Sequence, residues 1–228
     1  MRILAENISK RYFRKTGSAN YFYAVCPVSL DLGEGEVCVL MGRSGSGKTT
    51  LLNMLCGLLA PDSGRVLADE TDLYSLTDRE LSRLRGERFG VVPQGRSAVD
   101  TLTVLENILL PAKLYGRDLS AGAVRPWMER LGIGTLADAR PPELSGGELR
   151  RMAIVRALAQ SPACLFADEP TGDLDDENTA LVLSALHAYA HEAGKTVFLV
   201  THENDALRYA DRVCRMDHGQ LSWEKENA

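Results

Sequence analysis

The sequence contains no apolar stretch long enough to cross a membrane. A spanning helix needs about 20 consecutive, mostly apolar residues, whereas the runs Val37–Met41, Ala163–Ala167 and Val197–Val200 each end quickly in polar residues. The N-terminus meets an acidic residue, Glu6, at once and lacks the longer apolar core of a secretory signal. We therefore expect a chain that stays in the cytoplasm.

Paired cysteines and an excess of basic residues are also missing. The five cysteines are odd in number, include no Cys-x-x-Cys pair and mostly lie in apolar runs, which argues against disulfides and structural zinc. With 31 acidic and 26 basic residues, the formal net charge is −5, the wrong sign for a chain that coats nucleic acid. No nucleic-acid partner is expected.

What is present is the composition of an ordinary globular protein. The length of 228 residues fits one domain, or one domain with an inserted lobe. Apolar runs of strand length alternate with longer segments of helical spacing, which predicts an α/β fold with a largely parallel sheet. The central strands are expected at Glu36–Met41, Ala163–Ala167 and Thr196–Val200, because nearly continuous hydrophobicity suits strands covered on both faces.

The remaining elements complete this pattern. Between Gln94 and Leu144 the spacing predicts helices and no strand, so a helical lobe interrupts the α/β core. Further strands are expected at Arg2–Ile8, Arg65–Leu67, Phe89–Pro93, Val213–Met216 and Gln220–Trp223, and helices at about 48–59, 78–86, 102–115, 121–132, 146–160, 176–193 and 204–209.

A phosphate-binding loop follows the strand that ends at Met41. Residues 42–49 match G-x-x-x-x-G-K-[ST] at every defined position, between a strand and a helix as that motif requires. The glycines let backbone N–H groups converge on a polyanion, and the lysine reaches the β- and γ-phosphates. A flexible Gly/Ser turn would not explain the lysine and threonine in register. The expected nucleotide-binding residues are Gly42, Arg43, Ser44, Gly45, Ser46, Gly47, Lys48, Thr49 and Thr50.

Two carboxylates end the apolar strand Ala163–Ala167. Ligands of parallel sheets lie beyond the carboxyl ends of the strands, so Asp168 and Glu169 are expected beside the phosphate loop. Asp168, with the Thr49 hydroxyl, suits the coordination of Mg²⁺, and Glu169 suits polarising a water for attack on the γ-phosphate. Without other motifs, two carboxylates at a strand end more often belong to a solvated turn. Together with the phosphate loop, they favour a functional site.

A third motif, Leu144-Ser145-Gly146-Gly147-Glu148, precedes a long helical segment. Ser145 and Glu148 have the spacing of a capping box. That reading leaves two consecutive glycines in the first turn unexplained, since each costs about 1 kcal/mol against alanine in a helix. Close access of an anion to bare N–H groups would explain them.

With these motifs in this order, the sequence resembles the nucleotide-binding subunits of ATP-binding-cassette (ABC) transporters, whose signature is L-S-G-G-[QE]. The resemblance extends from about Tyr12 to Gly219. It implies a phosphate-loop NTPase (RecA-like) core with a mainly parallel sheet, an N-terminal antiparallel β subdomain and an inserted α-helical subdomain. Residues 1–228 would form one ATPase domain, with 1–93 and 150–228 as the core and 94–149 as the helical subdomain that carries the signature.

The resemblance also implies roles for single residues. Tyr12 matches the aromatic residue that stacks on adenine, although Tyr21, Phe22 and Tyr23 lie near enough to compete. Gln94 resembles the glutamine that contacts Mg²⁺ and the attacking water, with Pro93 before it where relatives usually carry another apolar residue.

Two further segments match the family pattern. His202 resembles the histidine that bridges the γ-phosphate and the catalytic Glu169. Residues 172–175 resemble the loop that crosses between paired subunits. His187, His191 and His218 lack such a context and are interpreted as surface residues.

The function implied is ATP hydrolysis that drives a membrane partner. Two subunits would pair head to tail, each ATP lying between the phosphate loop of one and Ser145, Gly146, Gly147 and Glu148 of the other, and hydrolysis would separate them. A transmembrane permease would dock on the lobe around 95–140 and hold the protein at the inner face of the membrane. Residues 102–111 and 170–172 resemble the branch that releases lipoproteins, exports macrolides or resists antimicrobial peptides.

Two other classes fit less well. Members of the superfamily that act on DNA or ribosomes carry a long coiled coil or two cassettes, whereas this chain has no sustained heptad run and one phosphate loop. A small-molecule kinase would leave the signature and His202 unexplained. The transported molecule is not specified by the sequence.

Overall fold

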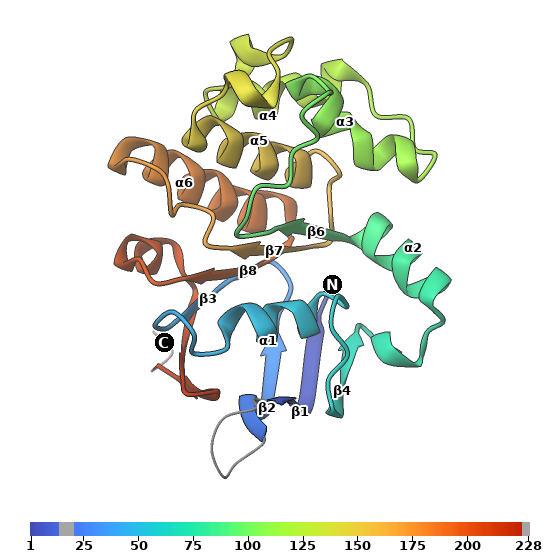
Figure 1. Ribbon diagram of the computed structural model, residues 1–228, viewed down its shortest axis with the longest axis vertical. Helices are drawn as coiled ribbons and strands as arrows, with labels where there is room; N and C mark the ends of the chain where they lie inside the picture. The colour runs from blue at the N-terminus through green and yellow to red at the C-terminus, as the bar shows by residue number, and fades with distance from the viewer. Residues whose placement is uncertain (14–20, 225–228) are drawn as a thin grey trace.

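The computed structural model describes residues 1–13 and 21–224, which form two β-sheets and the helices around them (Figure 1). One sheet has four strands in the order β2-β1-β4-β5, and the other has six in the order β10-β9-β3-β8-β7-β6. In chain order the strands are β1 (Ile3–Phe13), β2 (Tyr21–Leu32), β3 (Val37–Met41), β4 (Ser63–Ala68), β5 (Thr71–Asp72), β6 (Phe89–Val92), β7 (Cys164–Asp168), β8 (Thr196–Thr201), β9 (Arg212–Asp217) and β10 (Gln220–Trp223).

The six-stranded sheet is the centre of the fold and is parallel except at β10. All residues of β3, β7 and β8 are buried, as their continuous hydrophobicity predicts. Side chains alternate between the two faces of a strand, so Val37, Val39 and Met41 enter one core while Cys38 and Leu40 enter the other. The predicted α/β class with a mainly parallel sheet is confirmed.

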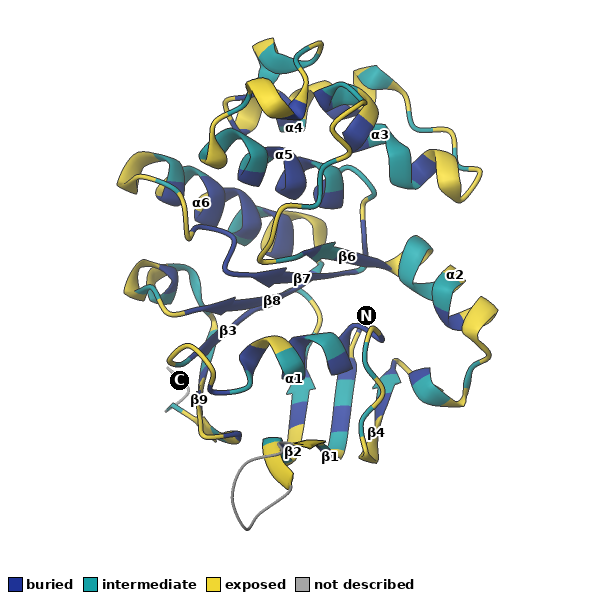
Figure 2. Cartoon of the chain, viewed as in Figure 1, coloured by how far each residue is buried: buried dark blue, intermediate teal, exposed yellow. Residues whose placement is uncertain are grey.

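The described part of the chain contains six α-helices. α5 and α6 lie over one face of the central sheet, and α1 lies between the two sheets, each with its buried side toward the strands (Figure 2). The helices are α1 (Lys48–Leu55), α2 (Asp78–Arg88), α3 (Val104–Leu114), α4 (Ala121–Arg130), α5 (Gly146–Leu158) and α6 (Asp176–Ala193), with 3-10 turns at Leu73–Ser75, Gly134–Leu136, Pro141–Glu143 and Asn204–Tyr209.

The helix predicted at 48–59 is longer than the observed α1, which ends at Leu55. The helix predicted at 204–209 is present as a 3-10 helix rather than an α-helix. α1 ends at Leu55 because Gly57 takes a left-handed backbone with φ +73°, a common way to stop a helix.

The four-stranded sheet contains the main error of the sequence-based prediction. No strand is expected at 21–32, yet β2 pairs there with β1 in antiparallel register, and β1 runs on to Phe13. Pro27 and a run of exposed aromatic residues at 21–23 obscure the strand pattern. β2 lies at the edge of its sheet, where a proline is tolerated. The predicted N-terminal antiparallel subdomain is confirmed.

The helices α3 and α4 and the start of α5 form the predicted lobe, with no strand among residues 94–149, all of which the structure describes. Buried Asn107 orders the loop before α3, because its side-chain amide donates to Val99 and Thr103 carbonyls and its oxygen accepts from the Val99 N–H. Val104 and Met128 share one core with the central sheet. The subdomain boundaries at 93/94 and 149/150 stay predictions.

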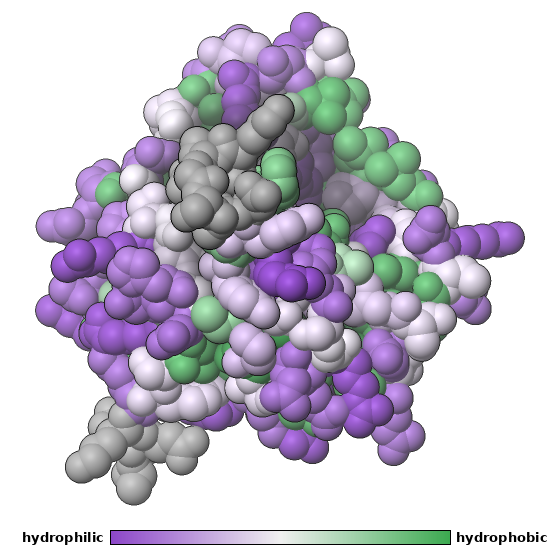
Figure 3. Space-filling view, turned by 60° about the horizontal axis from the view of Figure 1, so that its bottom comes forward, coloured by the Kyte–Doolittle hydropathy of each residue, from purple (hydrophilic) through white to green (hydrophobic). Residues whose placement is uncertain are grey.

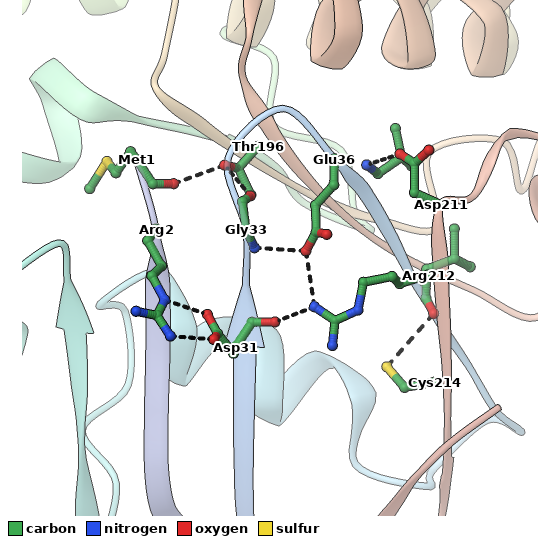
Figure 4. Close-up of polar contacts among 11 residues, drawn as sticks. Met1, Arg2, Asp31, Gly33, Glu36, Thr196, Asp211, Arg212 and Cys214 are labelled. Atoms are coloured by element: carbon green, nitrogen blue, oxygen red, sulfur yellow. Dashed lines mark hydrogen bonds and ion pairs between the residues drawn. The ribbon is translucent and has the colours of Figure 1, made fainter. Parts of the chain in front are cut away.

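A polar network joins the two sheets near the N-terminus (Figure 4). The Thr196 hydroxyl lies 2.8 Å from the carbonyl oxygens of both Met1 and Gly33. Arg212 donates to the Asp31 carbonyl at 2.8 Å and to Glu36 at 3.2 Å. These bonds connect β8 and β9 to the end of β2, and so hold the four-stranded sheet against the core.

No helix among the described residues is long and apolar enough to span a bilayer. On the face drawn in Figure 3, hydrophobic side chains occur in separate patches among hydrophilic ones. This surface agrees with a net charge of −5 and 25% charged residues.

Candidate nucleotide-binding site

The phosphate loop turns tightly between β3 and α1. Gly47 has φ +108°, and a Cβ atom placed there would lie 2.1 Å from the carbonyl oxygen of Ala24, so only glycine fits. The Lys48 ammonium group donates to the carbonyl groups of Gly42 at 2.8 Å and Arg43 at 3.1 Å. The lysine side chain thus lies folded over the loop, where its ammonium group can bind a phosphate.

Helix α1 begins at Lys48 with Gly47 as its N-cap, so no side chain caps its first N–H groups, and no acidic residue lies in its first turn. Unpaired N–H groups and the positive end of the helix dipole favour an anion there. The Gly219 N–H donates to the Ser46 carbonyl at 2.9 Å, so the turn between β9 and β10 supports the loop. The geometry is that of a phosphate site.

The two carboxylates after β7 have different surroundings. The Thr49 hydroxyl donates to Asp168 Oδ2 at 2.7 Å, while Asp168 Oδ1 is buried with no hydrogen-bond partner among the described residues. Burial and, less strongly, the nearby Glu169 charge raise the pKa of Asp168. A buried oxygen without a partner is costly, so this carboxylate is suited to a cation.

Glu169 adopts a left-handed backbone with φ +50°, which is uncommon outside glycine and occurs often at functional sites. Its carboxylate lies 2.9 Å from His202 Nδ1 and 3.7 Å from Lys48 Nζ. A largely buried carboxylate held by two basic groups can accept a proton from a water.

One open cavity of about 770 Å³ brings these groups together. Its lining includes residues from β1 and β2 of the four-stranded sheet, from the phosphate loop and the start of α1, from the loops after β6, β7 and β8, and from the β9–β10 turn. The residues are Tyr12, Phe22, Tyr23, Ala24, Ser44, Gly45, Ser46, Gly47, Lys48, Thr49, Thr50, Gln94, Glu169, His202, His218 and Gly219. Most of the residues expected from the sequence therefore meet in one place, whereas Gly42, Arg43 and Asp168 are not part of the lining.

The exposed aromatic side chains of β1 and β2 form two groups. Tyr12 and Phe22 are paired across β1 and β2, with ring centroids 6.2 Å apart, and they line the cavity with Tyr23. Tyr21 is not part of that lining and stacks edge-on against Phe13, 5.4 Å away. Tyr12, Phe22 and Tyr23 thus remain candidates for a base-stacking residue.

Three lining residues were not foreseen from the sequence as part of the site: Ala24, His218 and Gly219. His218 had been interpreted as a surface residue, and it is both exposed and at the cavity edge. Its position about 170 residues after the phosphate loop leaves no local sequence signal. The β9–β10 turn that brings it there becomes visible only in the fold.

The signature segment lies elsewhere. Ser145 caps α5: its hydroxyl accepts from the Glu148 N–H at 3.3 Å, and the Glu148 carboxylate accepts from the Ser145 N–H at 2.8 Å. The bonds that the Ser145 N–H and the Ser145 hydroxyl both donate to the Glu148 carboxylate hold the pKa of Glu148 below its usual range. Gly146 is exposed and has open space where a Cβ would be. None of Ser145, Gly146, Gly147 and Glu148 lines the 770 Å³ cavity.

The loop after Glu169 connects the site to α6. The Thr171 hydroxyl donates to the Glu203 carboxylate at 2.5 Å, which ties this loop to the end of β8 beside His202. Asp173 is exposed, and Asp175 caps α6 by accepting from the Asn178 N–H. The segment 172–175 thus leaves the site on the outer surface of the molecule.

A phosphate loop, a strand-end carboxylate pair and a parallel sheet covered on both faces define a phosphate-loop NTPase. A family model described as ABC transporter matches residues 25–172. The chain belongs to that family and is an ATP-binding, ATP-hydrolysing cassette.

Similar proteins agree with this assignment. The lipoprotein-releasing system ATP-binding protein LolD of Myxococcus xanthus is 39% identical over 197 residues, which cover 86% of this chain and 88% of that protein. The macrolide export ATP-binding/permease protein MacB of Chlorobaculum tepidum is 37% identical over 93% of this chain, but over only 32% of its own length. The branch expected from residues 102–111 and 170–172 is that of these relatives.

The solved structures include a dimer of MJ0796, titled a bacterial ABC transporter cassette, with a TM-score of 0.91 and 34% identity over 99% of both chains. Another is the same cassette in a dimeric post-hydrolysis state bound to ADP and phosphate, at 33% identity. The predictions of family, fold and ATPase activity are confirmed, while the roles of single residues stay predictions.

Proposed function

We propose that two copies of this ATPase pair head to tail, each ATP lying between the phosphate loop of one copy and the signature of the other. The observation that carries this proposal is the position of Gly146, which is exposed at a helix N-terminus yet absent from the lining of the chain's own nucleotide cavity. A helix N-terminus suits a phosphate, because its first N–H groups have no partner within the helix. In a head-to-tail pair, that phosphate comes from ATP bound to the partner.

Within each site the chain's own residues divide the work. The phosphate loop and Lys48 bind the β- and γ-phosphates, and one of the aromatic residues Tyr12, Phe22 and Tyr23 stacks on the base. Glu169 takes a proton from the attacking water as the water oxygen bonds to the γ-phosphorus and the bond to ADP breaks. His202 holds the Glu169 carboxylate in place at 2.9 Å.

The residues also fit Mg²⁺. Asp168 Oδ1 is buried and finds no hydrogen-bond partner within residues 1–13 and 21–224, and the Thr49 hydroxyl is already hydrogen-bonded to the other oxygen of that carboxylate. Oxygen ligands of this kind suit a small, hard cation. Thr49 and Asp168, with Gln94 from the cavity wall, would hold the ion, which supplies charge neutralisation to the phosphates.

We further propose that the pair drives a membrane permease and is held at the inner face of the membrane by it. The relatives named for lipoprotein release and macrolide export support this partner class. The lobe formed by α3 and α4 is the proposed docking region, because these helices lie beyond α5 from the central sheet (Figure 1) and none of their residues lines the nucleotide cavity. Export, or the transmission of force to lipoproteins or peptides, is the proposed outcome.

The head-to-tail arrangement is tested by Ser145→Arg. A bulky cation at the signature blocks the partner's phosphate, so we expect ATP hydrolysis to be lost while ATP binding to the isolated chain, followed by a fluorescent analogue, stays unchanged. Ser120→Arg is the matched control, since Ser120 is also an exposed helix N-cap, on α4. Weaker binding by the isolated Ser145→Arg chain would contradict a site completed by the partner.

A further inference from the structure

A single buried guanidinium lies where the loop after β6, helix α5 and the loop after β7 meet. Arg150 lies in the second turn of α5, and only 9% of its side chain is exposed. Its Nη1 donates to the Pro93 carbonyl at 2.8 Å, and its Nη2 donates to the Gln94 carbonyl at 2.6 Å. The same Nη2 lies 3.7 Å from the carboxylate of Asp173.

These contacts use properties that only arginine has. A guanidinium stays charged at every relevant pH, so its burial requires acceptors. Its planar fork holds two nitrogens in a fixed geometry, one against each of two consecutive carbonyl groups, and the single nitrogen of a shorter, more flexible lysine does not impose that geometry. The ladder of β6 ends at Val92, paired with Ala167, so the carbonyl groups of Pro93 and Gln94 lie just beyond it.

The segments that Arg150 joins lie around one small cavity. Gln94, Arg150, Asp173 and Gly146 of the signature all line a space of about 130 Å³. Gln94 also lines the large nucleotide cavity. The guanidinium therefore connects a residue of the chain's own ATP site with the helix whose first turn holds the signature.

We propose that Arg150 is a positioning residue for ATP hydrolysis, which holds the Gln94 main chain and the Asp173 loop in register with the signature helix. This inference rests on the proposed head-to-tail function. Because α5 begins at the signature, any shift of α5 against the partner's ATP moves Arg150, and Arg150 carries the Gln94 main chain with it. Completion of one ATP site is thereby linked to the placement of Gln94 in the other.

The test compares Arg150→Lys with Arg156→Lys in the full-length protein. Arg156 lies on the same helix and donates to the carbonyl group of Ser97 at 2.7 Å and to its hydroxyl, so it binds the same loop without touching Gln94 or Asp173. We expect Arg150→Lys to lower kcat about tenfold, the effect of losing one charge-assisted hydrogen bond. The KM for ATP and nucleotide binding by the isolated chain should change by less than about twofold. For Arg156→Lys, kcat should stay within about twofold of the unsubstituted value.

Each outcome decides the inference. An unchanged kcat in Arg150→Lys overturns it, and so does an equal loss in Arg156→Lys, since either result makes Arg150 an ordinary packing residue. A parallel loss of nucleotide binding by the isolated Arg150→Lys chain also overturns it. If Arg150→Lys does not fold, Arg150→Gln, which buries no charge, provides the same measurement. Lack of ATP hydrolysis by the unsubstituted protein would instead overturn the proposed function.

Discussion

The phosphate loop permits a sharp comparison between two of its glycines, Gly47 and Gly45. Both have a left-handed backbone, with φ +108° and +77°. They differ in their surroundings, because a Cβ at Gly47 would lie 2.1 Å from the Ala24 carbonyl oxygen, whereas a Cβ at Gly45 would meet nothing within 4 Å. The substitutions Gly47→Ala and Gly45→Ala thus separate backbone strain from steric clash.

The magnitudes follow from these positions. A non-glycine residue in a left-handed conformation costs about 1 kcal/mol or somewhat more, which is the whole cost at Gly45. At Gly47 the contact with Ala24 must be relieved as well, and because the two atoms would be only 2.1 Å apart, overpacking adds about 3 kcal/mol, the upper end of its usual range. The loop has little room to move because the Gly219 N–H donates to the Ser46 carbonyl. We expect the free energy of unfolding to fall by about 4 kcal/mol for Gly47→Ala and by about 1 kcal/mol for Gly45→Ala.

Thermal unfolding and ATP binding together measure this difference. For a chain of this size, 1 kcal/mol corresponds to about 2–4 °C in Tm, so Gly47→Ala should lower Tm by about 8–16 °C and Gly45→Ala by about 2–4 °C. If the loop instead relaxes by opening, Tm falls less and ATP binding is lost, again only for Gly47→Ala. Equal effects of both substitutions on Tm and on ATP binding would refute the steric argument.

Three further predictions concern the catalytic base, the base-stacking group and the cysteines. Glu169→Gln should lower ATP turnover by at least about 100-fold while ATP binding persists and an ATP-stabilised dimer accumulates in gel filtration; unchanged turnover would exclude Glu169 as the general base. Tyr12→Ala should weaken ATP binding about tenfold, as lost stacking predicts, and Tyr21→Ala, outside the cavity, should leave it unchanged. Burial raises the pKa of Cys56 to about 12, so at pH 8 this thiol is neutral and should resist alkylation by iodoacetamide in the folded protein. The partly exposed Cys26 should react. Equal labelling of the two cysteines, measured by mass spectrometry, would contradict this prediction.

The parts of the fold that could be predicted from the sequence are those with a strong local pattern. The buried strands β3, β7 and β8 are nearly continuous apolar runs, a pattern typical of strands that are covered on both faces. The phosphate loop and the signature were recognised from residue types at fixed spacing. In each case the physical requirement acts within about ten residues of the chain.

The parts that could not be predicted depend on contacts between segments that are far apart in the sequence. β2 is stabilised by its ladder with β1 rather than by its own alternation, and Pro27 conceals it. His218 reaches the site because β9 lies beside β3 in the sheet. Arg150 looks in the sequence like one more basic residue on a helix, and only the burial of its fork against Pro93 and Gln94 distinguishes it.

Adjacent carboxylates can do different work in this site because the strand ends between them. Asp168 is the last residue of β7, so its side chain keeps the direction set by the sheet and meets Thr49 at the start of α1. Glu169 follows the last paired residue of β7, and its N–H still donates to the Val200 carbonyl of β8 at 2.8 Å. Its backbone turns to φ +50°, and its carboxylate lies beside His202 and Lys48. If β7 continued through Glu169, the two carboxylates would point to opposite faces of the sheet, and one of them would point away from α1. The left-handed turn at Glu169 is thus what places a cation ligand and a proton acceptor on the same side of the sheet, one residue apart.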